Sequence, residues 1–195
     1  IQLAKEYNGE IISADSRQVY KGMNIGTGKD LPPKRIKIWG YDVVYPNEEW
    51  SPAQFAKMAN IWIKNIQERK KLPIVIGGDG FYLQAIINPP LSLDIPPNPD
   101  FRREIEMETV WQLQNRLKKL NPERFNKMNW SDQNNPRRLV RAIEITSSKL
   151  NPPAGGQSSK SQFKMQNFFQ IGLKATMDVI DKRIEERVNK RLKMG

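Results

Sequence analysis

Carboxylates are the side chains that could do acid–base chemistry in this sequence, because its 195 residues include neither histidine nor cysteine. That composition excludes disulfides, zinc fingers, cysteine nucleophiles and every triad that uses an imidazole as its base. Two aspartates follow apolar runs directly: Asp15 begins the segment D-S-R-Q-V-Y, and Asp79 lies in the turn G-G-D-G. A carboxylate held in such a position can accept a proton from a weak nucleophile during its attack.

The apolar runs before these aspartates predict the strands of a parallel sheet. Residues 10–14 (E-I-I-S-A) read as a short buried strand, and residues 72–76 (L-P-I-V-I) form the clearest strand. Helices are expected from Ser51 to about Arg69 and from Phe81 to about Ile87, an order that indicates parallel strands joined by helical crossovers. Open α/β sheets place their ligands at the carboxyl ends of the strands, where Asp15 falls.

Further elements are expected toward both ends of the chain. Helical spacing before Asn8-Gly9 predicts the end of a helix whose start is expected upstream of Ile1, and residues 34–44 predict another strand. Residues 168–173 are predicted to form a strand that returns to the sheet. Asp178 is predicted to cap a last amphipathic helix, whose apolar residues near helical spacing are Ile180, Ile184, Val188 and Leu192.

The positive charge of the sequence is concentrated in its second half. Lys and Arg number 32 against 21 Asp and Glu, a net charge of +11. Residues 1–100 hold 12 basic and 11 acidic side chains, whereas residues 101–195 hold 20 and 10. A solvated helical surface and a polyanion-binding surface both fit this distribution.

A proline-rich linker over residues 89–99 leads into a basic helical segment. The sequence therefore predicts an α/β core over 1–98 and 151–195, with a helical insertion over 99–150 and a loop over 151–162. In the segment 135–145 (N-P-R-R-L-V-R-A-I-E-I), Leu139, Ala142 and Ile143 share one helical face, and the other faces carry Arg137, Arg138 and Arg141. Trp111 and Trp130 are expected to pack between helices rather than stack on bases.

Four segments, in order, resemble those of the tRNA dimethylallyltransferases, also called tRNA isopentenyltransferases: residues 8–29, 77–82, 135–145 and 171–188. The resemblance implies a P-loop NTPase-like parallel sheet flanked by helices, with a basic helical insertion that binds RNA. It also implies the activity: Mg²⁺-dependent transfer of a dimethylallyl group from dimethylallyl diphosphate to the exocyclic amine of the adenosine 3′-adjacent to the anticodon.

The same resemblance implies roles for individual residues. Asp15 would be the base that accepts a proton from the adenine amine, and the amide of Gln18 would read a base edge. Contacts to the tRNA anticodon stem-loop would come from Asp15, Ser16, Arg17, Gln18, Arg102, Arg137, Arg138, Leu139, Val140 and Arg141. Asp79 would face the diphosphate, where the family carries threonine and where a carboxylate requires an intervening cation. No residue is assigned as a Mg²⁺ ligand.

Several positions depart from the family pattern. Met177 replaces a usual arginine, and Trp39-Gly40-Tyr41 replaces a His-His pair. The phosphate loop G-x-x-x-x-G-K-[ST] is expected upstream of Ile1, and a carboxyl-terminal part beyond Gly195.

Other functions stay open at this point. Prenyl transfer to free adenine nucleotides and an RNA-binding relative without catalysis are the alternatives, and a generic P-loop kinase fits less well. The longest uncharged run, residues 80–93, is too short to span a bilayer, and Ile1 begins no signal-peptide pattern. We therefore expect a cytoplasmic monomer without membrane contacts.

Overall fold

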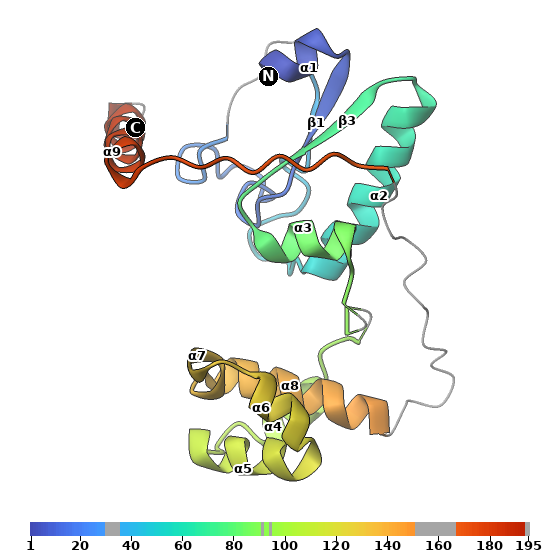
Figure 1. Ribbon diagram of the computed structural model, residues 1–195, viewed down its shortest axis with the longest axis vertical. Helices are drawn as coiled ribbons and strands as arrows, with labels where there is room; N and C mark the ends of the chain where they lie inside the picture. Colours follow the sequence, from blue (N-terminus) through green and yellow to red (C-terminus); the bar gives the residue numbers. More distant parts are fainter. Residues whose placement is uncertain (30–35, 91, 94, 151–166, 194–195) are drawn as a thin grey trace. The chain divides into compact units, whose positions relative to one another are not determined.

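Two units make up the computed structural model, which describes residues 1–29, 36–90, 92–93, 95–150 and 167–193. Unit 1 comprises Ile1–Pro90 with Phe163–Gly195, and unit 2 comprises Leu91–Gln162 (Figure 1). The sequence-based boundary at 98/99 differs because the structure assigns the end of the proline-rich linker to unit 2. The loop expected over 151–162 lies outside the described residues.

A parallel sheet forms the centre of unit 1. Its strands are β1 (Gly9–Ser13), β2 (Ile38–Trp39) and β3 (Leu72–Ile76), in the order β2-β1-β3. Ile11 pairs with Ile38 on one side and with Ile74 on the other. All five residues of β1 are buried, which confirms the expected buried strand and is typical of a central parallel strand.

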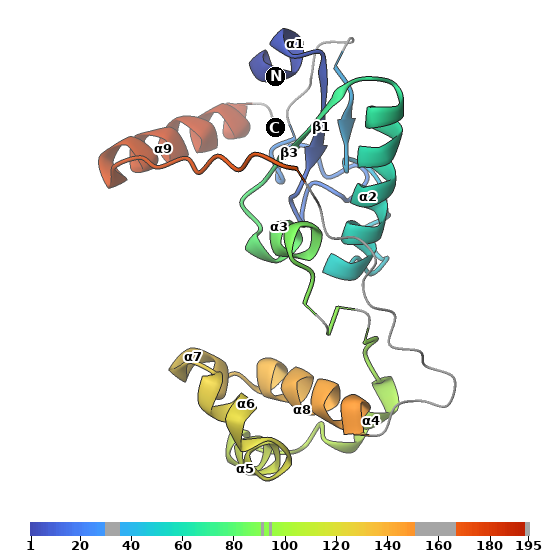
Figure 2. The same cartoon turned by 45° about the vertical axis from the view of Figure 1, so that its right-hand side comes forward.

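The described residues of unit 1 also form four helices: α1 (Gln2–Glu6), α2 (Pro52–Glu68), α3 (Gly80–Ile87) and α9 (Met177–Lys193). Figure 2 shows α2 running along the sheet and α3 below the end of β3. Ser51 and Gln54 form a capping box at the start of α2, with Pro52 in the first turn. The apolar stripe of α2 packs with α3 and β1 in a core of Ile12, Ala14, Phe55, Ala59, Trp62, Ile63, Ile66, Tyr82 and Ile86.

Glu10 places a buried carboxylate on β1. It is ion-paired with Arg69, accepts a hydrogen bond from Lys71 Nζ at 2.8 Å and another from Trp39 Nε1 at 2.8 Å. The Arg69 guanidinium, with Lys71 and Trp39, outweighs burial and holds the pKa of Glu10 far below its ordinary value. Glu10 therefore fastens the end of α2 and the start of β3 to the central strand.

Three sequence expectations for unit 1 are corrected by the structure. The strand expected over 34–44 is limited to β2 within the described residues, since 30–35 are not described. Residues 168–173 are irregular instead of a strand, because no described strand hydrogen-bonds to them, and Leu173 is almost fully exposed. Asp178 lies in the first turn of α9 rather than at its cap, because the Ile180 N–H already bonds to the Thr176 carbonyl.

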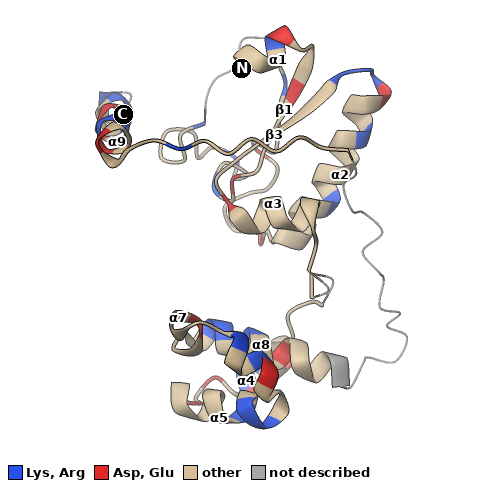
Figure 3. Ribbon diagram, viewed as in Figure 1, with Lys and Arg blue, Asp and Glu red and all other residues tan. Residues whose placement is uncertain are grey.

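Unit 2 is a group of short helices: α4 (Pro99–Glu104), α5 (Val110–Leu120), α6 (Pro122–Lys127), α7 (Trp130–Gln133) and α8 (Pro136–Leu150). Asparagine or threonine side chains cap four of them, at Asn98, Thr109, Asn121 and Asn129. The core contains Ile105, Leu113, Leu117, Phe125, Leu139, Ala142 and Ile143. Lys and Arg positions occur on α4, α5, α6 and α8, and those of α8 include its first half (Figure 3). In the described ranges, no helix combines the length and apolarity needed to cross a membrane.

Candidate functional site

Two turns meet at the carboxyl edge of the sheet. Ala14 and Asp15 follow β1, and Gly77–Gly80 follow β3, so parallel pairing brings both segments to one edge. The Ala14 N–H bonds to the Ile76 carbonyl at 2.7 Å. A Cβ at Gly77 would overlap the carbonyl oxygen of Ala14, so only glycine permits this approach of the two backbones.

The Asp15 carboxylate is oriented by its own turn. Its Oδ1 accepts hydrogen bonds from the N–H of Arg17 at 2.8 Å and of Gln18 at 3.3 Å. Its Oδ2 has no hydrogen-bond partner among the described residues. One oxygen is therefore fixed by the backbone, and the other is available to accept a proton or a hydrogen bond.

The Gln18 side chain has a positioning role in this structure. Its Oε1 accepts from Ser13 Oγ at 2.7 Å, and its Nε2 donates to the carbonyls of Thr27 and Gly28 at 3.3 and 3.1 Å. Both amide hydrogens are thus used to hold the 27–28 loop against the end of β1, and neither is left to read a base. Ser16 and Arg17, half-buried and exposed, have no side-chain hydrogen bond within the described residues.

Asp79 brings a second carboxylate to the same edge as the N-cap of α3. Its Oδ1 accepts from the N–H of Phe81 at 3.0 Å and of Tyr82 at 3.3 Å. The helix amides that an anion could have used are therefore already partnered. Asp79 Oδ2 has no hydrogen-bond partner among the described residues, at the place where the family resemblance implies the diphosphate side.

Tyr82 is a residue that sequence reasoning missed. Its ring stacks on Phe55 with centroids 4.3 Å apart, and its buried hydroxyl has no hydrogen-bond partner among the residues that the structure describes. Burial, followed by the nearby charges of Asp79, Tyr20 and Asp15, raises the pKa of Tyr82 well above its ordinary value, so the hydroxyl stays a proton donor. The sequence carried one signal for this residue: Tyr82 falls on the apolar face of the predicted helix. A phenol buried on such a face normally needs a hydrogen-bond partner.

The described residues contain no group of three or more His, Cys, Asp or Glu side chains able to hold a metal ion. The carboxyl edge offers Asp15 and Asp79, each with one oxygen already bonded to backbone N–H groups. Mg²⁺ is commonly bound by one or two carboxylates together with substrate phosphates. Asp15 and Asp79 fit a site in which substrate phosphates complete the Mg²⁺ ligands. Within the described residues they do not form a metal site made of protein ligands alone.

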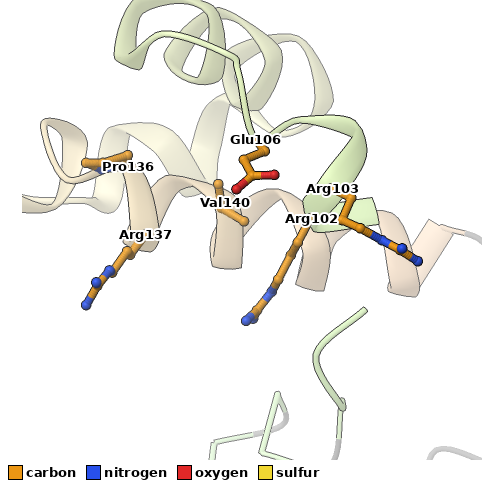
Figure 4. A pocket seen from close by; sticks show the side chains of 6 residues that line it. All are labelled: Arg102, Arg103, Glu106, Pro136, Arg137 and Val140. Carbon is orange, nitrogen blue, oxygen red and sulfur yellow. The ribbon is translucent and has the colours of Figure 1, made fainter. Parts of the chain in front are cut away.

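In unit 2, a cavity of about 480 Å³ lies beside the start of α8 and the end of α4. Figure 4 shows the guanidinium groups of Arg102 and Arg137 extending to the same side of the ribbon. Arg137 is exposed and has no ion pair or hydrogen bond within the described part of the chain. The remaining lining residues are Arg103, Glu106, Pro136 and Val140.

Arg102 and Arg141 are partners of a buried carboxylate. Glu144 accepts bonds from Arg102 Nε and Nη2 at 3.1 Å each, from Arg141 Nη1 at 2.6 Å and from the Asn98 N–H at 2.6 Å. Burial opposes ionisation, but these hydrogen bonds outweigh it and keep the pKa of Glu144 below its ordinary value. Arg141 also donates to the carbonyl of Ile95 at 2.6 Å, and the network therefore joins α8 to the linker.

The remaining predicted contact residues of α8 divide between surface and core. Arg138 forms an ion pair with Asp132 of α7 and stays half-exposed. Val140 is half-buried and lines the cavity. Leu139 is fully buried in the core of unit 2, which leaves it no surface to offer RNA and corrects its predicted role to one of packing.

The structure also corrects the expectation for two tryptophans. Trp111 and Trp130 were expected to pack between helices, yet they are 70% and 80% exposed. On α5, Trp111 lies two residues before the buried Leu113, about 200° around a helix with 3.6 residues per turn, so it faces away from the core. Trp130 begins a helix of four residues, which has too few positions to bury a large ring.

Known proteins resemble this chain in sequence and in structure. Residues 18–195 match the family described as IPP transferase. A tRNA dimethylallyltransferase from Carboxydothermus hydrogenoformans is 36% identical and one from Geotalea uraniireducens is 36% identical. The matches cover 100% of this chain and 64% and 62% of those relatives, so the chain spans less than two thirds of their length.

Solved structures are similar over the whole chain. The full-length tRNA isopentenylpyrophosphate transferase from Bacillus halodurans matches at 34% identity and a TM-score of 0.59, over 100% of this chain and 61% of that one. A eukaryotic dimethylallyltransferase acting on tRNA matches at 28% identity and a TM-score of 0.74, over 100% of this chain and 49% of that one. These matches confirm the predicted fold class, a P-loop NTPase-like parallel sheet flanked by helices.

Proposed function

This chain belongs to the IPP transferase family, and from that premise we propose that it transfers a dimethylallyl group to tRNA. The donor is dimethylallyl diphosphate, and the acceptor is the exocyclic amine of the adenosine 3′-adjacent to the anticodon. The observation that carries the proposal is Asp15, a carboxylate fixed through Oδ1 at the carboxyl edge of the sheet with Oδ2 available.

Asp15 answers the main chemical difficulty of this reaction. The adenine amine is a weak nucleophile because its lone pair is delocalised into the ring. As its nitrogen bonds to the allylic carbon, the carbon–oxygen bond to diphosphate breaks and the diphosphate leaves with the electron pair. Asp15 Oδ2 takes the proton that the amine must lose, which lowers the barrier to attack.

The departing diphosphate would face Asp79 and the turn after β3. Asp79 carries a negative charge there and already caps the α3 amides, so this side of the site needs a compensating cation. Mg²⁺ held by Asp79 and the diphosphate oxygens would supply that positive charge. The family resemblance supports the same cofactor.

Unit 2 would hold the RNA so that the target base can leave its stack. Turning a base out of an anticodon loop costs a few kcal/mol, which contacts to the surrounding RNA offset. Arg137 is the best candidate for a phosphate contact, because it borders the cavity and has no partner within the described residues. Arg102, Arg103 and Arg138 are already paired. Arg103 pairs with the exposed Asp100 and Arg138 with Asp132, and these two would engage RNA by exchanging their partners, whereas Arg102 is held by the buried Glu144.

The proposal is tested with the full-length gene product, dimethylallyl diphosphate, Mg²⁺ and an anticodon stem-loop carrying adenosine 3′ of the anticodon. We expect the RNA to gain the mass of one prenyl group. Asp15→Asn should abolish transfer while RNA binding persists, and Asp178→Asn on the exposed α9 is the matched control. Transfer to AMP but not to RNA would favour a free-nucleotide enzyme, and binding without any transfer would indicate an RNA-binding relative.

A further inference from the structure

Two large aromatic side chains are left exposed on unit 2, at positions where the sequence predicts packing. Trp111 is the second residue of α5 and Trp130 is the first of α7, with exposed fractions of 70% and 80%. Tryptophan is enriched at binding interfaces, because the large apolar area of its indole gains free energy when it is covered. A contact with another molecule would account for both side chains.

A hydrogen bond joins the helices that carry the two tryptophans. The Gln114 side chain donates to the carbonyl of Gln133 at 2.8 Å, which joins α5 to α7. Each tryptophan precedes its glutamine by three residues, and residues three apart on a helix are neighbours on its surface. Both tryptophans therefore stand on the backbone about one helical turn from the same contact.

The start of α8 brings cationic side chains to this region. Asp132 of α7 pairs with Arg138, and the Asn134 side chain donates to the Trp130 carbonyl at 2.8 Å. Trp130 is thereby attached to the helix whose first turn carries the unpaired Arg137. A nucleic acid with unpaired bases complements such a surface, because its phosphates bind cationic groups and its bases stack on indoles.

We propose that Trp111 and Trp130 form a stacking surface for unpaired nucleobases of RNA, distinct from the carboxyl-edge site of unit 1. The inference rests on the proposed function for the identity of its partner. Stacking requires bases that are not held in a duplex, so the surface selects loops over paired stems. The neighbouring guanidinium of Arg137 adds a contact that depends on charge and not on base pairing.

Binding to two RNAs of equal length separates stacking from charge. The full chain is titrated with an anticodon stem-loop and with a blunt duplex. Trp130→Ala should weaken stem-loop binding about tenfold, the range expected for one lost stack, and should leave duplex binding unchanged. Trp111→Ala should have a smaller effect in the same direction, and Trp130→Phe should retain most of the affinity because a ring remains.

Met107→Ala is the matched control, because Met107 is 92% exposed on the same unit and has no ring. Its stem-loop affinity should equal that of the parent chain. Thermal unfolding of each variant separates loss of stacking from loss of fold. Wild-type stem-loop affinity in both tryptophan variants would overturn the inference, and so would an equal loss of duplex binding.

The inference and the proposed function fail differently. Loop-selective binding that depends on Trp130, without prenyl transfer, would overturn the proposed reaction and support the stacking surface. Prenyl transfer with unchanged binding in Trp130→Ala would overturn the stacking surface alone. If sedimentation shows a dimer that Trp130→Ala converts to a monomer, the indoles cover a second copy of this chain and the RNA assignment is wrong.

Discussion

Replacing Arg141 by alanine should destabilise unit 2, whereas replacing Arg137 should weaken RNA binding without changing stability. Arg141 donates to Glu144 Oε2 at 2.6 Å and to the carbonyls of Ile95 and Ser92 at 2.6 and 3.3 Å. Arg137, four residues earlier on the same helix, has no such contacts within the described residues. Both arginines belong to the run for which the resemblance implies RNA contacts, yet in the part of the chain that the structure describes only Arg141 makes hydrogen bonds that stabilise the fold.

The size of the effect follows from the bonds that are lost. A bond to a neutral carbonyl contributes about 1 kcal/mol, and one to a charged carboxylate about 1.5–3 kcal/mol. The Arg141 side chain is 32% exposed, so water replaces part of this, and Glu144 keeps Arg102 and the Asn98 N–H. We expect Arg141→Ala to lower the free energy of unfolding of unit 2 by about 2–3 kcal/mol and Arg137→Ala to change it by less than about 0.5 kcal/mol.

Urea unfolding followed by circular dichroism measures the first quantity, and stem-loop titration at several salt concentrations measures the second. Arg137→Ala should reduce the slope of log affinity against log salt by about 0.7–0.9, the value of one phosphate contact. Arg141→Lys is the informative companion, because an ammonium group cannot reproduce the guanidinium fork. An unfolding midpoint unchanged by Arg141→Ala, or lowered equally by Arg137→Ala, would refute the reasoning.

Glu10→Gln should cost about 2 kcal/mol of stability at neutral pH through its lost charged hydrogen bonds. Because the folded pKa of Glu10 is lowered, its contribution is present above the ordinary carboxyl range and is lost as pH falls below about 4, so urea midpoints of parent and variant should converge in acid. Gly77→Ala should destabilise unit 1 by more than about 2 kcal/mol, since its Cβ would overlap the Ala14 carbonyl; a near-neutral unfolding midpoint would contradict that close approach. Tyr82→Phe should leave stability unchanged or raise it by about 1 kcal/mol, because the buried hydroxyl has no partner in the described part of the chain; a clear loss in urea unfolding would reveal one.

The parts of the fold that sequence predicted correctly are those encoded by local pattern. β1 and β3 are short apolar runs bounded by turn residues, and α2 carries both a capping box and an apolar stripe. The place of Asp15 followed from them, because parallel strands present their carboxyl ends at one edge. The strand expected over 168–173 has an equally apolar sequence, but a strand also requires a hydrogen-bonding partner, which local pattern does not encode.

The candidate site was predictable as a position and not as a set of contacts. Sequence placed Gln18 beside Asp15, but its use in holding Thr27 and Gly28 depends on residues nine and ten positions away. The exposure of Trp111 could have been predicted from the sequence, because its spacing from Leu113 puts it on the opposite helical face. Trp130 lies in a helix too short for periodicity to indicate a face.

The net charge of a segment does not tell which of its arginines are free to bind RNA. Residues 91–150 hold 11 Lys and Arg against 8 Asp and Glu, so bulk charge alone is a weak reason to assign RNA binding to this unit. What distinguishes the arginines is their partners: Arg102 and Arg141 neutralise a buried glutamate, Arg138 pairs with Asp132, and Arg137 has none within the described residues. The paired arginines hold the helices of unit 2 in place, while the unpaired arginine and the exposed indoles are available to bind RNA. An RNA surface built this way depends on a few well-placed groups, and its salt dependence should therefore be shallow for so basic a chain.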